Sequence, residues 1–90
     1  GTYVCAAGHL HIAGTVQNLA DISLGYIKVA GKTFDPDGKL LGTAMSSTRQ
    51  PVLRQGEKTK FDLEFLTVIG SLVRQAKRHE VTVIEAQAKQ

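Results

Sequence analysis

Three residues near the start of the chain have side chains and a spacing that could hold a metal ion. Cys5, His9 and His11 follow the pattern C-x3-H-x-H. If the two histidines lie on one strand, their side chains point to the same face, with Cα atoms about 7 Å apart. Imidazole nitrogens bind Zn²⁺ or Cu²⁺, and a thiolate from Cys5 would add a third ligand.

The same pattern also fits a solvated strand face. His9 and His11 would then lie opposite the apolar side chains of Leu10 and Ile12. A structural zinc site needs four ligands, and this pattern lacks a fourth. We therefore favour the solvated face, and we expect no bound cofactor and at most weak surface binding of Cu²⁺ or Zn²⁺. The third histidine, His79, lies too far along the chain to be assigned to such a site.

The elements that must position these side chains are predicted to be strands, because apolar and polar residues alternate with a period of two. The alternation is clearest at 58–66 and is also present at 9–16, 26–34 and 80–86. The segment 67–79 fits a helical turn and an irregular loop equally well. The residues expected to fill the core are Leu10, Ile12, Val16, Phe61, Leu63, Val81 and Val83.

A tight turn is predicted at Asp35-Pro36-Asp37-Gly38. Pro36 fixes φ for the first central position of a type I turn, and Gly38 supplies the left-handed conformation that follows it. This sequence therefore predicts a hairpin with a bulge. Gly31 weakens the preceding strand and is expected to mark a further bulge.

The composition limits the class of protein. The chain has 90 residues, of which 42% are hydrophobic and 21% charged, so we expect one globular domain rather than a disordered segment. No run of about 18 apolar residues, as a membrane-spanning helix needs, is present. The single cysteine excludes an internal disulfide and any metal site built from several cysteines. The net charge of +3 is mild.

Three segments, taken in order, resemble the FxLYD domain family. Residues 12–18 (IAGTVQN) are similar to its I-x-G-x-V-x-N opening, and 34–43 (FDPDGKLLGT) to its aromatic-Asp-x-x-Gly hairpin. Residues 53–57 (LRQGE), with Phe61 four residues on, are similar to its L-x-P-G-E…F segment. The resemblance implies an all-β fold, an immunoglobulin-like antiparallel β-sandwich of about seven strands, with residues 1–90 as a single domain. It also implies a module of secreted or cell-envelope proteins, hence an extracytoplasmic location, and no shared catalytic residues.

No catalytic residues are predicted. Neither the nucleophile motif G-x-S-x-G nor a glycine-rich phosphate loop is present. Asp35 and Asp37 could act as paired carboxylates, but their place in a Pro-Gly turn explains both. A nucleophilic thiol or hydroxyl needs a base and an orienting acid beside it, and no recognisable motif supplies them. We expect that the protein is not an enzyme.

A small basic cluster is formed by Arg74, Lys77 and Arg78. Such a cluster could meet phosphates or lie near an anionic membrane surface, but a solvated loop is the simpler interpretation. The aromatic residues lie elsewhere, so the stacking platform that single-stranded nucleic acid requires is missing. We therefore expect no nucleic-acid partner.

The leading functional hypothesis is a non-catalytic interaction or spacer module. Its partner, another protein or a second copy, would pair with an open sheet edge through backbone hydrogen bonds. The strand 80–86 is the candidate edge, because its outward residues Thr82 and Ile84 are not the lysines that protect exposed edges. The segment 67–78 could instead fold back over Ile84. The alternative function is an extracytoplasmic metal-binding protein that uses His9 and His11.

Overall fold

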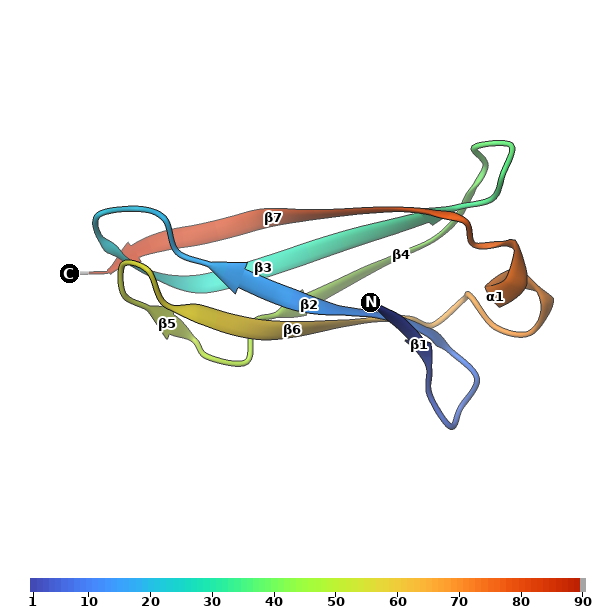
Figure 1. Ribbon diagram of the computed structural model, residues 1–90, viewed down its shortest axis with the longest axis horizontal. Coiled ribbons are helices and arrows are strands. Elements are labelled where there is room, and N and C mark those ends of the chain that lie inside the picture. The colour runs from blue at the N-terminus through green and yellow to red at the C-terminus, as the bar shows by residue number, and fades with distance from the viewer. Residues whose placement is uncertain (90) are drawn as a thin grey trace.

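The strands form two antiparallel sheets that pack face to face, as Figure 1 shows for the computed structural model. The structure describes residues 1–89. Sheet A contains, in spatial order, β1 (Thr2–Val4), β2 (Leu10–Gln17) and β6 (Lys58–Phe65). Sheet B contains β3 (Ser23–Phe34), β4 (Leu40–Ser47), β5 (Val52–Leu53) and β7 (Arg78–Lys89). The predicted all-β sandwich of about seven strands is confirmed.

The long strand β3 is the centre of sheet B and pairs with its three other strands. Residues from Lys28 to Phe34 pair with both β4 and β7, so these two strands lie on opposite edges of β3. Leu24 and Gly25 pair with both β5 and β7 in the same way. The last strand, β7, therefore runs along the whole of β3, and its far edge has no partner strand among residues 1–89.

The core lies between the two sheets and follows the predicted alternation. On the inner face of sheet A, Leu10 pairs with Phe65 and Ile12 with Leu63. Each of these four side chains is at most 7% exposed. Val29 of β3 meets them from the opposite sheet and is 1% exposed. The burial of these apolar side chains holds sheet A and sheet B together.

The prediction that Val81 and Val83 belong to the core is wrong, because they are 42% and 45% exposed. Both residues pair with buried positions of β3, so they point to the inner side of sheet B. Sheet A has only three strands, however, and its strand β6 packs over β4 and β3. Sheet A therefore leaves β7 largely uncovered. The other predicted core residues, Val16 and Phe61, lie partly buried at the margin of the core.

The segment 67–79 contains one short helix, α1 (Ser71–Gln75), and its last two residues open β7. No helix in the described part of the chain is long and apolar enough to cross a membrane. The apolar residues of this segment that pack against the core are Val68, Leu72, Val73 and Ala76. Of the two alternatives, the structure does not show the fold-back over Ile84, which is 51% exposed.

Two glycines explain local features of β3 and β4. Gly38 has a φ of 85° and the pairing of β3 with β4 shifts register just before the turn, which confirms the predicted hairpin with a bulge. Gly31 does not mark a bulge, because the shifts in the β3–β7 pairing lie at 25–29 instead. A Cβ at Gly31 would lie 2.7 Å from Cδ1 of Leu63. A glycine at position 31 therefore allows the two sheets to approach closely.

Replacing Leu63 with alanine should lower the free energy of unfolding by about 2–5 kcal/mol, because a fully buried side chain leaves a cavity. Val83→Ala is the matched control on the uncovered strand, and we expect a loss of roughly 1 kcal/mol or less. Urea denaturation monitored by circular dichroism measures both. Equal losses for the two variants would contradict the conclusion that β7 lies outside the core.

Candidate metal site

The register between β2 and β6 brings a predicted histidine next to two carboxylates. His11 pairs directly with Glu64, and the next outward position, Ala13, pairs with Asp62. Because side chains alternate along a strand, these residues all lie on the outer face of sheet A, opposite the core. Tyr3 of β1 pairs with His11 from the other side. Tyr3, His11 and Glu64 therefore form a row across the three strands of sheet A.

The hairpin loop between β1 and β2 supplies the other two candidate ligands. The backbone N–H of Cys5 donates to the carbonyl of His9 at 3.1 Å, so these two residues close the loop. Within the loop, the N–H of Gly8 donates to the carbonyl of Cys5 at 2.9 Å. Gly8 has a φ of 86°, a conformation that residues with a Cβ rarely adopt. The loop thus holds Cys5 and His9 together beside β2.

The candidate side chains meet around one atom, the Oε2 oxygen of Glu64. This oxygen lies 2.9 Å from Nδ1 of His9 and 3.8 Å from Sγ of Cys5. The possible ligand atoms of Cys5, His9 and Glu64 all lie within 4.8 Å of one another. Nε2 of His11 lies 3.5 Å from the same oxygen. The structure therefore gathers the three predicted candidates and adds Glu64 to them.

Two neighbours hold the imidazole of His11 in place. Its Nδ1 lies 2.7 Å from Oδ1 of Asp62, within hydrogen-bond distance. The ring of Tyr3 stacks on the imidazole, with 4.5 Å between ring centroids and 20° between the planes. The hydroxyl of Tyr3 donates a hydrogen bond to Oδ2 of Asp62. Tyr3 therefore reaches across β2 and covers His11.

The expectation that both histidines lie on a solvated face is wrong for His11. This residue is only 9% exposed, because Tyr3 covers one side of its ring. Its Nε2 is buried and has no hydrogen-bond partner within residues 1–89. Leaving such a polar atom without a partner costs free energy, so an orphaned nitrogen requires an explanation. The side chain of His9 is more accessible, at 24%.

The surroundings of Cys5 favour its thiolate form. Partial desolvation raises the pKa of the thiol, but the backbone N–H groups of His9 and Ala7 and the neighbouring imidazole of His11 outweigh this effect and lower the pKa. The thiolate is the form of cysteine that binds metal ions. The loop that positions the sulfur therefore also favours the form of cysteine that can bind a metal ion.

The other titratable groups of the cluster shift one another. The hydrogen bond to Asp62 raises the pKa of His11, and the hydrogen bond to His9 lowers the pKa of Glu64. Desolvation raises the pKa of Asp62, but hydrogen bonds from Tyr3 and His11 outweigh it and lower the pKa. The hydrogen bond to Asp62 raises the pKa of Tyr3 to about 12. Both carboxylates are therefore ionised at neutral pH, while Tyr3 keeps its proton.

The predicted edge residues lie on the other sheet. Thr82 and Ile84 line a shallow groove on the outer face of sheet B, together with Ala30, Lys32 and Glu80. This groove is separate from the histidine cluster on sheet A. The structure therefore places the two candidate sites of the sequence analysis, the edge strand and the histidines, on different sheets.

The predicted basic cluster is divided between two elements. Arg74 lies in α1, Lys77 follows it, and Arg78 opens β7. Nη1 of Arg78 lies 2.7 Å from Oε2 of Glu80, and its guanidinium lies 4.1 Å from the ring centroid of Phe34. One of the three positive charges is therefore already paired within sheet B.

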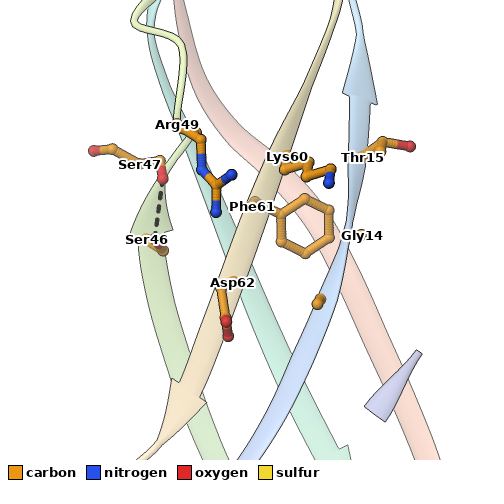
Figure 2. A pocket seen from close by; sticks show the side chains of 9 residues that line it. Gly14, Thr15, Ser46, Ser47, Arg49, Lys60, Phe61 and Asp62 are labelled. Atoms are coloured by element: carbon orange, nitrogen blue, oxygen red, sulfur yellow. Dashed lines mark hydrogen bonds between the residues drawn. The ribbon is translucent and has the colours of Figure 1, made fainter. Parts of the chain in front are cut away.

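A surface pocket lies between β2, β4 and β6, and Figure 2 shows the side chains that line it. The ring of Phe61 lies against Gly14, where a Cβ would come within 2.8 Å of the ring. Arg49 and Lys60 give the lining positive charge, and Asp62 gives it negative charge. The lining of this pocket therefore carries charges of both signs. The donor set around Glu64 is chemically better defined.

Glu64, Asp62 and Tyr3 are not among the site residues predicted from the sequence. The alternation at 58–66 does place both carboxylates on one strand face, which is the signal that could have found them. The alternation does not indicate which strand pairs with 58–66. Tyr3 lies on a strand of three residues, which is too short to show any period.

Comparison with known proteins leaves this description unchanged. No protein-family model, curated protein or solved structure gives a significant match to the chain. The assignment of the site therefore rests on its geometry and its donor atoms.

Replacing Asp62 with asparagine should lower the pKa of His11 toward the ordinary value of about 6.5, because the variant removes the charged acceptor beside Nδ1. An NMR titration of the His11 ring proton measures this pKa. Asp37→Asn makes the same chemical change in the 35–38 turn and should leave the pKa unchanged. A His11 pKa that does not move in Asp62→Asn would show that the observed contact does not control the imidazole.

Proposed function

We propose that the protein binds a divalent transition-metal ion through Cys5, His9 and Glu64. The observation that carries the proposal is the mutual approach, within 4.8 Å, of a sulfur, an imidazole nitrogen and a carboxylate oxygen. These residues come from two places in the chain, the 5–9 loop and β6, and the fold brings them together. Thiolate and imidazole ligands suit zinc and other borderline-soft ions rather than Mg²⁺ or Ca²⁺.

The distances between these atoms are close to those of a coordinated ion. Zinc binds sulfur at about 2.3 Å and nitrogen or oxygen at about 2.0–2.2 Å, so neighbouring ligands of a tetrahedral ion lie roughly 3.3–3.6 Å apart. The oxygen of Glu64 lies 3.8 Å from the sulfur of Cys5 and 2.9 Å from the nitrogen of His9. These two separations are therefore within about half an ångström of those in a tetrahedral zinc site.

The local charge also supports a cation at this place. Asp62 and Glu64 are two negative groups in one small area, and the surroundings lower the pKa values of both carboxyl groups and of the Cys5 thiol. The protein as a whole carries a net charge of +3, so this patch differs in sign from the molecule around it. A divalent ion would neutralise this negative patch. His9 and His11 neutralise it only when their imidazoles are protonated.

We favour a ligand role over a nucleophilic role for Cys5. The thiol of Cys5 lies near the imidazole of His11, which in turn contacts the carboxylate of Asp62. A nucleophile, a base and an orienting acid are connected in the same way in nucleophilic triads. The carboxylate of Glu64, however, lies 3.8 Å from the sulfur and 3.5 Å from Nε2 of His11. Its negative charge beside the sulfur repels the oxyanion that an acyl transfer forms.

Calorimetric titration of the reduced protein with Zn²⁺ at neutral pH tests the proposal. We expect one site with submicromolar affinity, and release of protons where the ligands are still protonated. Cys5→Ser should weaken the affinity at least about a hundredfold, which is more than the loss of an outer hydrogen bond usually costs.

The matched control is His79→Ala, because His79 lies on sheet B and contacts Thr33 there. It should leave the affinity for Zn²⁺ unchanged. Wild-type binding no tighter than that of Cys5→Ser would contradict the proposed function.

A second candidate function is supported by the exposure of β7. Within residues 1–89 the far edge of this strand has no partner strand, and its apolar residues Val81, Val83 and Ile84 are 42–51% exposed. We propose that a second copy of the chain pairs with this edge. Together with the resemblance to FxLYD domains, this exposure favours an immunoglobulin-like interaction module of an envelope or secreted protein, with the metal site on the opposite sheet.

Sedimentation equilibrium of the wild type and of Ile84→Lys tests the second candidate. We expect a wild-type dimer and a monomeric variant with unchanged unfolding, because a lysine on the edge strand opposes strand addition. Leu19→Lys, at a loop position that is 82% exposed, is the control and should remain dimeric. A wild type that is monomeric at high concentration would overturn the proposal.

A further inference from the structure

We propose that His11 is the fourth ligand of this ion, bound through Nε2, and that the site is a closed tetrahedral site for an ion of the Zn²⁺ class. The inference rests on the proposed function, because it assumes that Cys5, His9 and Glu64 bind a metal. The ion would then have four protein ligands, with Nε2 of His11 as the fourth.

The first observation is the orphaned nitrogen of His11. Nε2 is buried, lacks a hydrogen-bond partner among residues 1–89, and belongs to a residue that is 91% buried. It lies 3.5 Å from Oε2 of Glu64, which is close to the ligand-to-ligand distance in a tetrahedral zinc site. A metal ion bound beside Glu64 would supply the partner that Nε2 lacks.

The second observation is the orientation of the imidazole. Nδ1 lies 2.7 Å from Oδ1 of Asp62, a carboxylate oxygen placed to accept the Nδ1 proton. In the neutral ring this leaves the lone pair on Nε2, directed toward Glu64. Histidines that bind metals usually donate their other N–H to a carboxylate in this way. Asp62 is thus a positioning residue for His11.

The third observation is the cover that Tyr3 provides. Its ring stacks on His11 at 4.5 Å, and its hydroxyl donates to Asp62. The ring therefore cannot rotate freely, and the position of Nε2 is fixed before an ion binds. Together with one sulfur and one carboxylate, this nitrogen favours four-coordinate Zn²⁺ or Co²⁺ over ions that require six oxygen ligands.

Cobalt substitution tests this inference separately from the proposed function. Co²⁺ takes the place of Zn²⁺, and a sulfur-to-cobalt charge-transfer band in the near ultraviolet reports the bond to Cys5. Intense visible ligand-field bands report a four-coordinate ion, and weak bands report a six-coordinate one. For the wild type we expect both the charge-transfer band and intense visible bands.

In His11→Ala the charge-transfer band should remain, while the visible bands lose most of their intensity and the affinity falls about 10- to 100-fold or more. His79→Ala should give the wild-type spectrum. If His11→Ala also gives the wild-type spectrum, His11 is not a ligand, although the proposed function stands. If the wild type shows no charge-transfer band, the proposed function itself fails.

A measurement on the wild type keeps the inference testable even if His11→Ala does not fold. Long-range ¹H–¹⁵N NMR distinguishes the two ring nitrogens of His11 before and after addition of Zn²⁺. We expect Nδ1 to stay protonated and the resonance of Nε2 to shift to that of a metal-bound nitrogen. An unchanged Nε2 resonance in protein whose site is saturated with Zn²⁺ would overturn the inference.

Discussion

The antiparallel register of β2 against β6 is the constraint on which both the core and the candidate site depend. It pairs Ile12 with Leu63 on the inner face and His11 with Glu64 on the outer face. A shift by one residue would turn the apolar row outward and the polar row inward, so the burial of Leu63 and Phe65 also fixes the position of Glu64. The hydrophobic effect therefore holds together a thiol, imidazoles and carboxylates that have little tendency to assemble by themselves.

The hairpin that carries Cys5 depends on the same sheet. The strand β1 has three residues, and it pairs only with β2 in the described part of the chain. Tyr3 adds a link from β1 across β2 to Asp62 on β6. An ion bound by Cys5 and Glu64 would add a second link, between residues that are 59 positions apart in the sequence. Such a cross-link closes a long loop, so metal binding and the stability of this sheet would be coupled.

Period-two alternation was enough to predict which faces of the strands are apolar, and it correctly assigned Leu10, Leu63 and the inner side of β7. It does not show whether a strand of the other sheet lies opposite, which is why the core prediction failed for Val83. The local C-x3-H-x-H pattern contains three side chains that the structure places beside Glu64. Their carboxylate partners lie more than 50 residues later and are brought there by strand pairing, which the sequence alone does not specify.

X-ray absorption at the zinc edge of the zinc-loaded protein reports the atoms bound to the ion, so it shows directly whether Cys5 and the two histidines are ligands. We expect one sulfur at about 2.3 Å and three nitrogen or oxygen atoms at about 2.0–2.2 Å, with the outer scattering of two imidazole rings. The sulfur can come only from Cys5 or Met45, and Met45 lies on β4 of the other sheet. A spectrum of six oxygen or nitrogen ligands without sulfur would contradict a four-coordinate site that includes Cys5.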